Sequence, residues 1–204
     1  MLKPPTSILG VDEVGYGCSA GPLVVGAFYA PTEAWTVEGL GDSKKISEKL
    51  REKLHRELCA LCCYAVLFVP VEEINEKGLG RCHHEAMEKV AQVLIDRFGP
   101  PNRVVFDGNV SYMSGGEAII KADASYPSVS AASVLAKVTR DRYMTDVVHK
   151  EYPEYGFAKH KGYWTVEHER AVRAHGVCAQ HRTGYRNIKE LMGQKPVAFS
   201  RGRS

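Results

Sequence analysis

An unbroken apolar run long enough to cross a bilayer, which takes about 20 residues, does not occur in this 204-residue sequence. An apolar signal-peptide segment at the start is also missing, so we expect neither a membrane span nor a secretory leader. The six cysteines contain one C-x-x-C spacing, from Cys59 to Cys62, but no second pair that would make a zinc site convincing, so buried free thiols are the better interpretation. This cysteine usage indicates a reducing, cytoplasmic compartment.

The sequence also lacks internal repeats, low-complexity tracts and a strong sign of a second domain, so one domain with an appendage is expected. Its content of 44% hydrophobic and 25% charged residues is typical of a soluble globular protein and argues against disorder. Net charge is only +3, but the last segment, from Arg182 to Ser204, holds six Lys or Arg against one acid, Glu190. Such a local excess is typical of a solvated tail or of a surface that meets an anionic partner.

Apolar periodicity predicts strands that alternate with helices. Short apolar runs predict strands over residues 7–13, 22–30, 62–69, 103–106 and 118–121. Amphipathic spacing predicts helices from Ser47, as N-cap, to Leu61, and over residues 82–97, 128–150 and 165–175, whereas 152–164 has the composition of a loop. The first three strands are expected to form an antiparallel meander, and the later strands, separated by helices, to pair in parallel.

Acidic residues stand where three apolar runs end. The first run reaches Asp12 and Glu13, the second reaches Asp107, and the third reaches Asp123. A carboxylate buried at the end of a strand is costly unless something compensates its charge, and a divalent cation often does so. The three runs therefore predict a metal-dependent hydrolase site on one edge of a sheet.

The neighbouring positions of Asp12 and Glu13 set a condition on this site. Successive side chains of a strand face opposite ways, so Glu13 can join Asp12 only if the chain turns there. Gly15 and Gly17 follow at once and make such a turn feasible, and they let the backbone approach a ligand closely.

Six collinear motifs carry a resemblance to a known family. They are Gly-Val-Asp-Glu-Val-Gly-Tyr-Gly at 10–17, Gly-Asp-Ser-Lys-Lys at 41–45, Asp-Gly at 107–108, Lys-Ala-Asp at 121–123, the small-residue segment at 130–142, and Tyr-Gly-Phe-Ala-Lys-His-Lys-Gly-Tyr at 155–163. Together they resemble the type 2 ribonuclease H family, ribonuclease HII, over about residues 8–189.

The resemblance implies the ribonuclease H-like fold of the α/β class, a five-stranded mixed sheet flanked by helices with a small helical C-terminal region. It also implies a single domain over residues 1–204. Within it we expect a catalytic core over about 1–150, a substrate-binding helical region over about 151–190, and a basic tail over 191–204.

The implied activity is that of an endonuclease that hydrolyses the RNA strand of RNA/DNA hybrids and cuts on the 5′ side of ribonucleotides embedded in duplex DNA. By motif position, Asp12, Glu13, Asp107 and Asp123 correspond to the catalytic and metal-binding carboxylates of the family. Two divalent ions can activate a water and stabilise the leaving oxygen of a phosphodiester. An all-oxygen site fits Mg²⁺ or Mn²⁺ and does not fit Zn²⁺.

Further positions are candidates for substrate binding through the same resemblance. Gly15, Tyr16 and Gly17 match a family Gly-Arg-Gly segment that grips the ribose 2′-hydroxyl, so Tyr16 removes a charged contact to phosphate. Tyr163 matches the family tyrosine that packs on the deoxyribose after the ribonucleotide. Lys44 and Lys45 are candidates for phosphate contacts. The adjacent histidines at 83–84 are expected at the exposed start of a helix, with no ligand role.

Two other functions stay open at this point. A type 3-like nuclease that prefers long hybrids shares the Asp-Glu-Val-Gly-x-Gly pattern, although Asp123 favours type 2, since type 3 enzymes tend to have Glu there. A protein that binds hybrids without cutting them is the second alternative, and the four intact carboxylates argue against it. The expected partner is an RNA/DNA hybrid or ribonucleotide-containing duplex DNA. The protein is expected to be a monomer that acts in DNA replication and repair. The basic tail is expected to be either solvated or bound by a replication partner.

Overall fold

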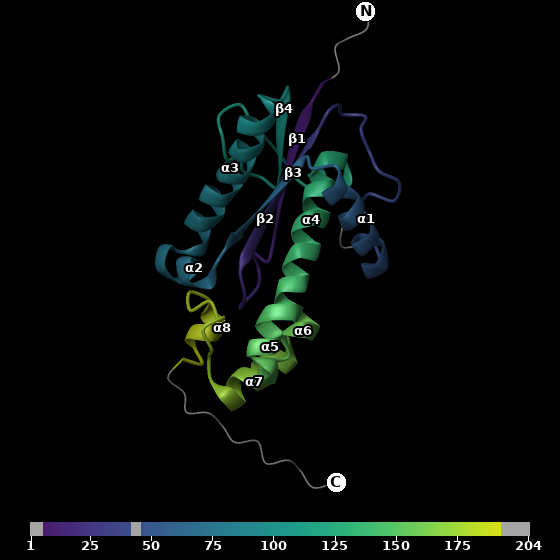
Figure 1. Ribbon diagram of the computed structural model, residues 1–204. Helices are drawn as coiled ribbons and strands as arrows, with labels where there is room; N and C mark the ends of the chain where they lie inside the picture. The colour runs from purple at the N-terminus through teal and green to yellow at the C-terminus, as the bar shows by residue number, and fades with distance from the viewer. Residues whose placement is uncertain (1–5, 42–45, 193–204) are drawn as a thin grey trace, which may run out of the picture.

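The computed structural model describes residues 6–41 and 46–192, which fold around a five-stranded mixed sheet (Figure 1). The strand order is β3-β2-β1-β4-β5. The strands are β1 (Ile8–Val14), β2 (Leu23–Ala30), β3 (Tyr64–Val69), β4 (Arg103–Asp107) and β5 (Glu117–Ile119). The predicted α/β class and five-stranded mixed sheet are therefore confirmed.

The pairing of the strands follows from their connections. A short link joins β1 to β2, and these two strands pair antiparallel, as do β2 and β3. The chain reaches β4 only after two helices, and a crossover of this length allows β4 to pair parallel with β1. In this pairing Val11 lies beside Phe106 at the end of the ladder, so the residues that follow them are neighbours at the point where β1 and β4 separate.

The helices agree with the predicted pattern, with one addition. They are α1 (Glu48–Ala60), α2 (Val71–Lys77), α3 (Leu79–Phe98) and α4 (Pro127–Tyr143), and α4 continues through η2 (Met144–Val148) into α5 (His149–Glu151). Ser47 caps α1 as predicted, because its side chain accepts a hydrogen bond from the amide of Leu50. The helix α2 was not predicted, because it has only two buried residues, too few for a clear apolar period.

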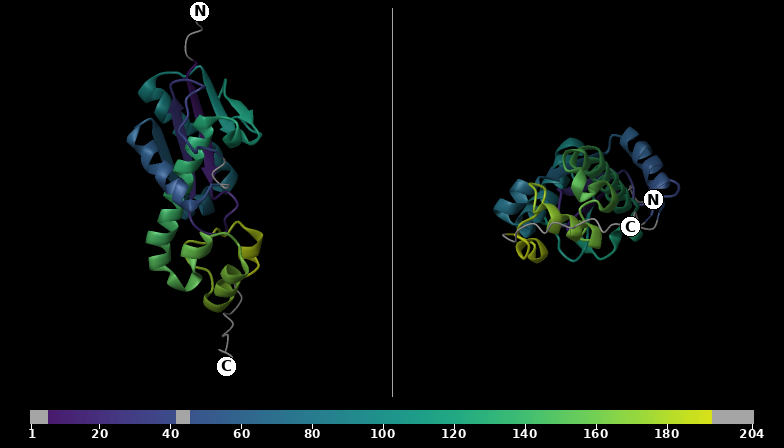
Figure 2. Two further views of the ribbon diagram at one scale, coloured as in Figure 1. Left: turned by 90° about the vertical axis from the view of Figure 1, so that its right-hand side faces the viewer. Right: turned by 90° about the horizontal axis from the view of Figure 1, so that it is seen from below.

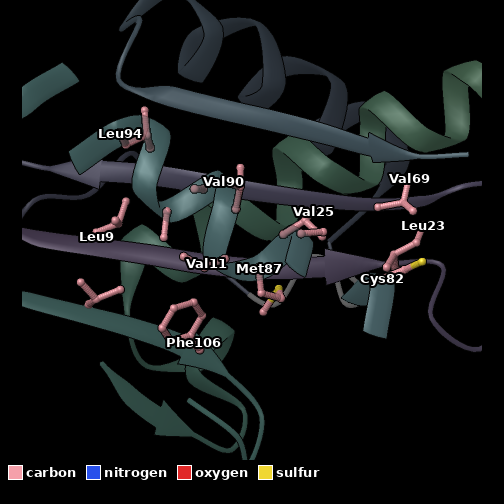
Figure 3. Packing of buried hydrophobic residues seen from close by; sticks show 14 of the residues in the cluster. Leu9, Val11, Leu23, Val25, Val69, Cys82, Met87, Val90, Leu94 and Phe106 are labelled. Atoms are coloured by element: carbon pink, nitrogen blue, oxygen red, sulfur yellow. The ribbon is translucent and has the colours of Figure 1, made fainter. Parts of the chain in front are cut away.

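The two faces of the sheet are covered by different helices, with α3 on one side and α4 and α1 on the other (Figure 1). On the α3 side, Leu9, Val11 and Phe106 pack with Met87 and Val90 of the helix (Figure 3). Strand residues of the opposite parity, Ile8 and Val105, pack on the α4 side. This period of two decides which side of the sheet each acidic residue meets.

A small helical region lies at the end of the sheet where β1 stops, below it in Figure 2. It contains η3 (Pro153–Tyr155), α6 (Phe157–His160), α7 (Val166–His175) and α8 (Arg186–Lys189), around its own buried cluster that includes Phe157 and Val172. The predicted loop over 152–164 is therefore partly helical; Gly156 and Lys161, both left-handed, end its two short turns. Within the described ranges, no helix is both long and apolar enough to span a membrane.

Candidate active site

Asp12 and Asp107 lie side by side at the end of the ladder between β1 and β4. The parallel register pairs Val11 with Phe106, so the next residues along β1 and β4 are the two acids. Asp12 is 6% exposed and accepts a hydrogen bond from the Glu13 amide (2.8 Å). Burial, together with the charges of Glu13 and Asp107, raises the pKa of Asp12 to about 8, against an opposing hydrogen bond to Ser133. The edge of the sheet therefore gathers negative charge in a place that is poorly solvated.

Asp123 joins this edge through the backbone. Its segment is η1 (Ala122–Ala124), a single 3₁₀ turn, whereas a strand was predicted up to residue 121. The strand β5 ends earlier because Lys121 adopts a left-handed conformation, with φ of 60°. Asp107 Oδ1 accepts a hydrogen bond from the Ala122 amide (2.6 Å), which holds the residue before Asp123 against the end of β4. Asp123 itself is buried.

Glu13 points to the other side of the sheet. The strand β1 stays extended as far as Val14, so the turn required to bring Glu13 beside Asp12 does not occur at Glu13. Its side chain instead faces α3, where Glu13 Oε2 lies 3.5 Å from His83 Nε2. A cavity of about 450 Å³ opens at this point, and its lining includes Glu13, Tyr16, His83, Asp107 and Tyr112.

His83 does not have the exposed position predicted for it. The helix α3 begins at Leu79, one turn earlier than expected, and this turns the His83 ring toward the carboxylates with its side chain only 12% exposed. The ring packs edge-on against Tyr16 and Tyr112, at centroid distances of 4.9 and 5.1 Å. No local pattern indicated this contact, because Tyr112 comes from a loop whose path depends on the tertiary fold. His84, by contrast, is exposed as predicted.

The segment Gly15-Tyr16-Gly17 forms a turn directly beyond β1. Gly15 has a φ of +87°, and a Cβ atom there would lie 2.3 Å from Nε of Arg140, so only glycine fits. The carbonyl oxygen of Tyr16 accepts hydrogen bonds from Arg182 Nη1 (3.1 Å) and from the Tyr185 hydroxyl. Gly17 is exposed, and a Cβ atom added there would meet no other atom within 4 Å, which leaves its backbone open to a ligand.

Two buried arginines connect this turn to the rest of the protein. Arg140 is fully buried and donates to the carbonyls of Pro22 (2.8 Å), Ala20 (3.1 Å) and Lys161 (2.8 Å). Arg182 is also fully buried and donates to Gly21 in addition to Tyr16. Arginines in a helix and near a basic tail are usually solvated, so only the fold shows that these two are structural.

Tyr163 stands beside a different cavity from the carboxylates. It is 41% exposed, and Lys137 Nζ lies 5.8 Å from the centre of its ring. The preceding residue, Gly162, accepts hydrogen bonds from the amides of Ser19 (3.0 Å) and Ala20 (3.3 Å), so Tyr163 is tied to the chain that follows the glycine turn. The other two predicted phosphate contacts, Lys44 and Lys45, lie outside the described residues.

Three buried histidines support the backbone of Tyr163. His168 Nδ1 lies 3.0 Å from the Tyr163 carbonyl oxygen and must donate to it, so Nε2 of a neutral His168 is an acceptor. His181 Nε2, 3.1 Å away, therefore donates to His168, and its Nδ1 accepts from the Cys178 amide (2.9 Å). The ring of His160 stacks on His168 at 4.4 Å. Burial lowers the pKa of His168 to about 3 and that of His181 to about 4, which keeps the chain neutral.

The acids suit a divalent cation by their chemistry. They offer only carboxylate oxygens, the ligands that Mg²⁺ and Mn²⁺ prefer. The raised pKa of Asp12 shows that its charge lacks compensation from the protein, and a bound cation would supply it. Among residues 6–41 and 46–192, however, no three His, Cys, Asp or Glu side chains already converge as a metal-binding group. The assignment of all four acids as ligands stays a prediction.

Comparisons with known proteins agree with this geometry. The family model described as Ribonuclease HII matches residues 9–188. A Ribonuclease HII of Polaromonas sp. is 41% identical over 194 residues, which cover 92% of this chain and 94% of the relative.

Two solved structures have the same fold. The ribonuclease HII in the PCNA:RNase HII complex from Archaeoglobus fulgidus is 28% identical, with a TM-score of 0.71, and the match covers 88% of this chain and 95% of the other. Bst-RNase HIII in complex with Mn²⁺ has a TM-score of 0.72 at 18% identity, covering 93% and 70%, and shows likeness of fold alone. The matched family model and the 41% identical relative show that this chain belongs to the ribonuclease HII family and is a ribonuclease H.

Proposed function

We propose that this ribonuclease H cuts the RNA strand of RNA/DNA hybrids and, in duplex DNA, cuts on the 5′ side of an embedded ribonucleotide. The observation that carries the proposal is the set of acids at the shared edge of β1 and β4, beside an open turn that ends in Gly17. Carboxylates here repel a phosphodiester unless cations intervene, so the edge is built for a cation-dependent reaction and not for simple binding.

Asp12, Glu13, Asp107 and Asp123 would hold two divalent ions, Mg²⁺ or Mn²⁺, in this proposal. Glu13 would reach them from the cavity on the α3 side, which Asp107 also lines. The Mn²⁺ complex of the Bst-RNase HIII structure supports it as a likeness of fold. The chemistry that such ions would supply is activation of a water for attack on phosphorus and stabilisation of the charge on the leaving 3′ oxygen. The protein's own contribution is to hold the acids on two neighbouring strands and to fix η1 through the bond from Ala122 to Asp107.

Recognition of the ribonucleotide rests on the turn and on Tyr163. The Tyr16–Gly17 peptide is trans, so holding the Tyr16 carbonyl against Arg182 and Tyr185 aims the Gly17 amide in the opposite direction. An N–H fixed in this way can donate to a ribose 2′-hydroxyl, which DNA lacks. Tyr163, half-exposed and supported by the histidine chain, offers a flat ring for a deoxyribose on the other side of the junction.

A comparison of two substrates tests the proposal against its alternatives. A duplex with one ribonucleotide and a long RNA/DNA hybrid are incubated with Mg²⁺ or Mn²⁺, and the cut positions are read at single-nucleotide resolution. We expect cleavage of both, with the cut 5′ of the single ribonucleotide. Cleavage of the long hybrid alone would assign a type 3-like specificity, and binding without any cut would assign a binding protein.

Asp12→Asn provides the matched control, because it keeps the size of the side chain and removes its charge. Loss of cutting in a variant that is at least as stable to urea as the wild type would support the role of Asp12, and near-normal turnover would remove it from the reaction.

We also propose that the protein acts in DNA replication and repair, in the cytoplasm and as a monomer. The Archaeoglobus ribonuclease HII structure is that of a complex with PCNA, which supports a replication partner for the basic tail of this chain. The tail over residues 193–204 lies outside the described residues, so this proposal rests on its composition. We expect a variant without the tail to cleave its substrates as the full chain does but no longer to co-purify with a replication protein.

A further inference from the structure

The side chain of His83 lies on the wall of the carboxylate cavity, and the reaction proposed above gives it no role. Its Nε2 atom is inaccessible to solvent and has no hydrogen-bond partner. The same atom lies 3.5 Å from Glu13 Oε2, slightly beyond hydrogen-bond distance. A buried ring nitrogen without a partner is unfavourable, and here a small rotation of Glu13 is enough to supply one.

The neighbours of His83 determine which of its nitrogens carries the proton, because the Glu13 carboxylate beside Nε2 can only accept, whereas the Tyr112 hydroxyl beside Nδ1 can donate. Its hydroxyl lies 3.4 Å from His83 Nδ1, and its ring meets the His83 ring edge-on at 5.1 Å. A neutral imidazole that accepts from the Tyr112 hydroxyl at Nδ1 has its hydrogen on Nε2. The N–H of His83 is therefore directed at the Glu13 carboxylate.

Glu13 needs such a partner because of its place on β1. It leaves the sheet on the α3 side, whereas Asp12 leaves on the α4 side, so the hydrogen bonds around Asp12 do not restrain it. Without a restraint its flexible side chain can rotate within the cavity of about 450 Å³. Each alternative rotamer that the Glu13 side chain can adopt lowers the affinity of the site for a cation at the strand edge.

We propose that His83 is a positioning residue that donates its Nε2–H to Glu13 Oε2 and holds the other carboxylate oxygen toward the edge where Asp107 lies. The proposal rests on the proposed role of Glu13 as a cation ligand. Ligating carboxylates are commonly oriented by hydrogen bonds from residues behind them, and loss of such a partner typically costs about 10- to 100-fold in metal affinity. Tyr112 acts one step further back, because its hydroxyl can donate to Nδ1 of the His83 tautomer that faces Glu13 with Nε2–H.

The experiment measures Mn²⁺ affinity by calorimetry on the full chain without nucleic acid, and then kcat and KM on a single-ribonucleotide duplex. His83→Leu removes the donor, and His83→Gln places an amide N–H near the position of Nε2. His149→Leu is the matched control, because His149 is also half-buried with an unpartnered ring nitrogen but lies on α5. We expect His83→Leu to weaken Mn²⁺ binding by about 10- to 100-fold and to lower kcat with KM unchanged, while His83→Gln and His149→Leu stay near wild type.

The other outcomes are decisive as well. Equal loss in His83→Leu and His83→Gln would show that ring packing against Tyr16 and Tyr112 matters instead of the donor, and normal Mn²⁺ binding in His83→Leu would also overturn the proposal. Loss of Mn²⁺ binding with Mg²⁺ binding intact would make His83 a direct ligand and not a positioning residue. Glu13→Gln tests the metal site separately from the role of His83. If this variant binds Mn²⁺ and cleaves normally, the proposed metal site fails. If it loses Mn²⁺ binding and cleavage while His83→Leu loses neither, only the role of His83 fails.

Discussion

Mild acid should destabilise this protein through the histidine chain behind Tyr163. Burial lowers the pKa of His168 to about 3 and that of His181 to about 4, from an ordinary value of 6.5. The unfolded chain binds these two protons as the pH falls through 6.5, but the folded chain does not. Stability that is fully present above pH 6.5 is therefore lost as the pH falls toward 4.

The size of this effect follows from the proton count. Each histidine that stays neutral only in the folded state costs up to about 1.4 kcal/mol per pH unit below its unfolded pKa. From about pH 6.5 to about pH 5 the two histidines together remove roughly 3 kcal/mol, a substantial part of the roughly 5 to 15 kcal/mol typical of a domain. Asp12 acts in the opposite direction: its raised pKa means that the metal-free folded state keeps a proton that the unfolded chain releases, so acid stabilises it between about pH 8 and pH 4.

Urea unfolding of Asp12→Asn in the presence of a chelator isolates the histidine contribution. Trp164 reports locally, because its ring lies 5.1 Å from His168, and Trp35→Phe removes the other tryptophan signal. We expect the free energy of unfolding to fall by at least roughly 3 kcal/mol over this pH range, because burial also lowers the pKa of His160 and of His55. His168→Gln, which cannot titrate at this position, should show a smaller slope. An unfolding free energy that is the same at both pH values, or a full slope in His168→Gln, would refute this role of the buried histidines.

Three further perturbations follow from the geometry of the site. Gly15→Ala should destabilise the fold by about 2 kcal/mol or more, since the new Cβ meets Arg140 at a φ of +87°. Gly17→Ala has open space around its Cβ and should leave urea unfolding unchanged while it weakens substrate binding, so equal stability of the two variants would contradict this. Tyr163→Ala should reduce cleavage of a single-ribonucleotide duplex more than cleavage of a long hybrid, and an equal reduction of both would make Tyr163 structural. Tyr16→Arg should lose the ring contact with His83 but add one phosphate contact, and so steepen the salt dependence of binding in Ca²⁺ by about 0.9 on a log-log plot. An unchanged slope with weaker binding would show that Tyr16 already contacts the substrate.

Local patterns in the chain were enough to predict the order of strands and helices and the edge at which the acids gather, whereas the sheet order followed from the family resemblance. Strand and helix periods predicted β1, β2, β4 and the long helix over 128–150, because each has a buried face with a regular apolar spacing. Acids directly after apolar runs predicted Asp12 and Asp107 at one end of the sheet, and their parallel register confirms that they are neighbours. Both features could be predicted because they depend on residues close together in the chain.

The groups that surround these acids could be identified only in the folded molecule. The extended path of β1 through Val14 turns Glu13 toward α3, where His83 and Tyr112 meet it from segments far apart in the sequence. Arg140 and Arg182 likewise have no local signal of burial, since most of their partners are carbonyls more than a hundred residues away. A period of apolar residues predicts which face of an element is buried, but the pairing of a buried polar side chain depends on the packing of whole elements, and that is settled only when the chain has folded.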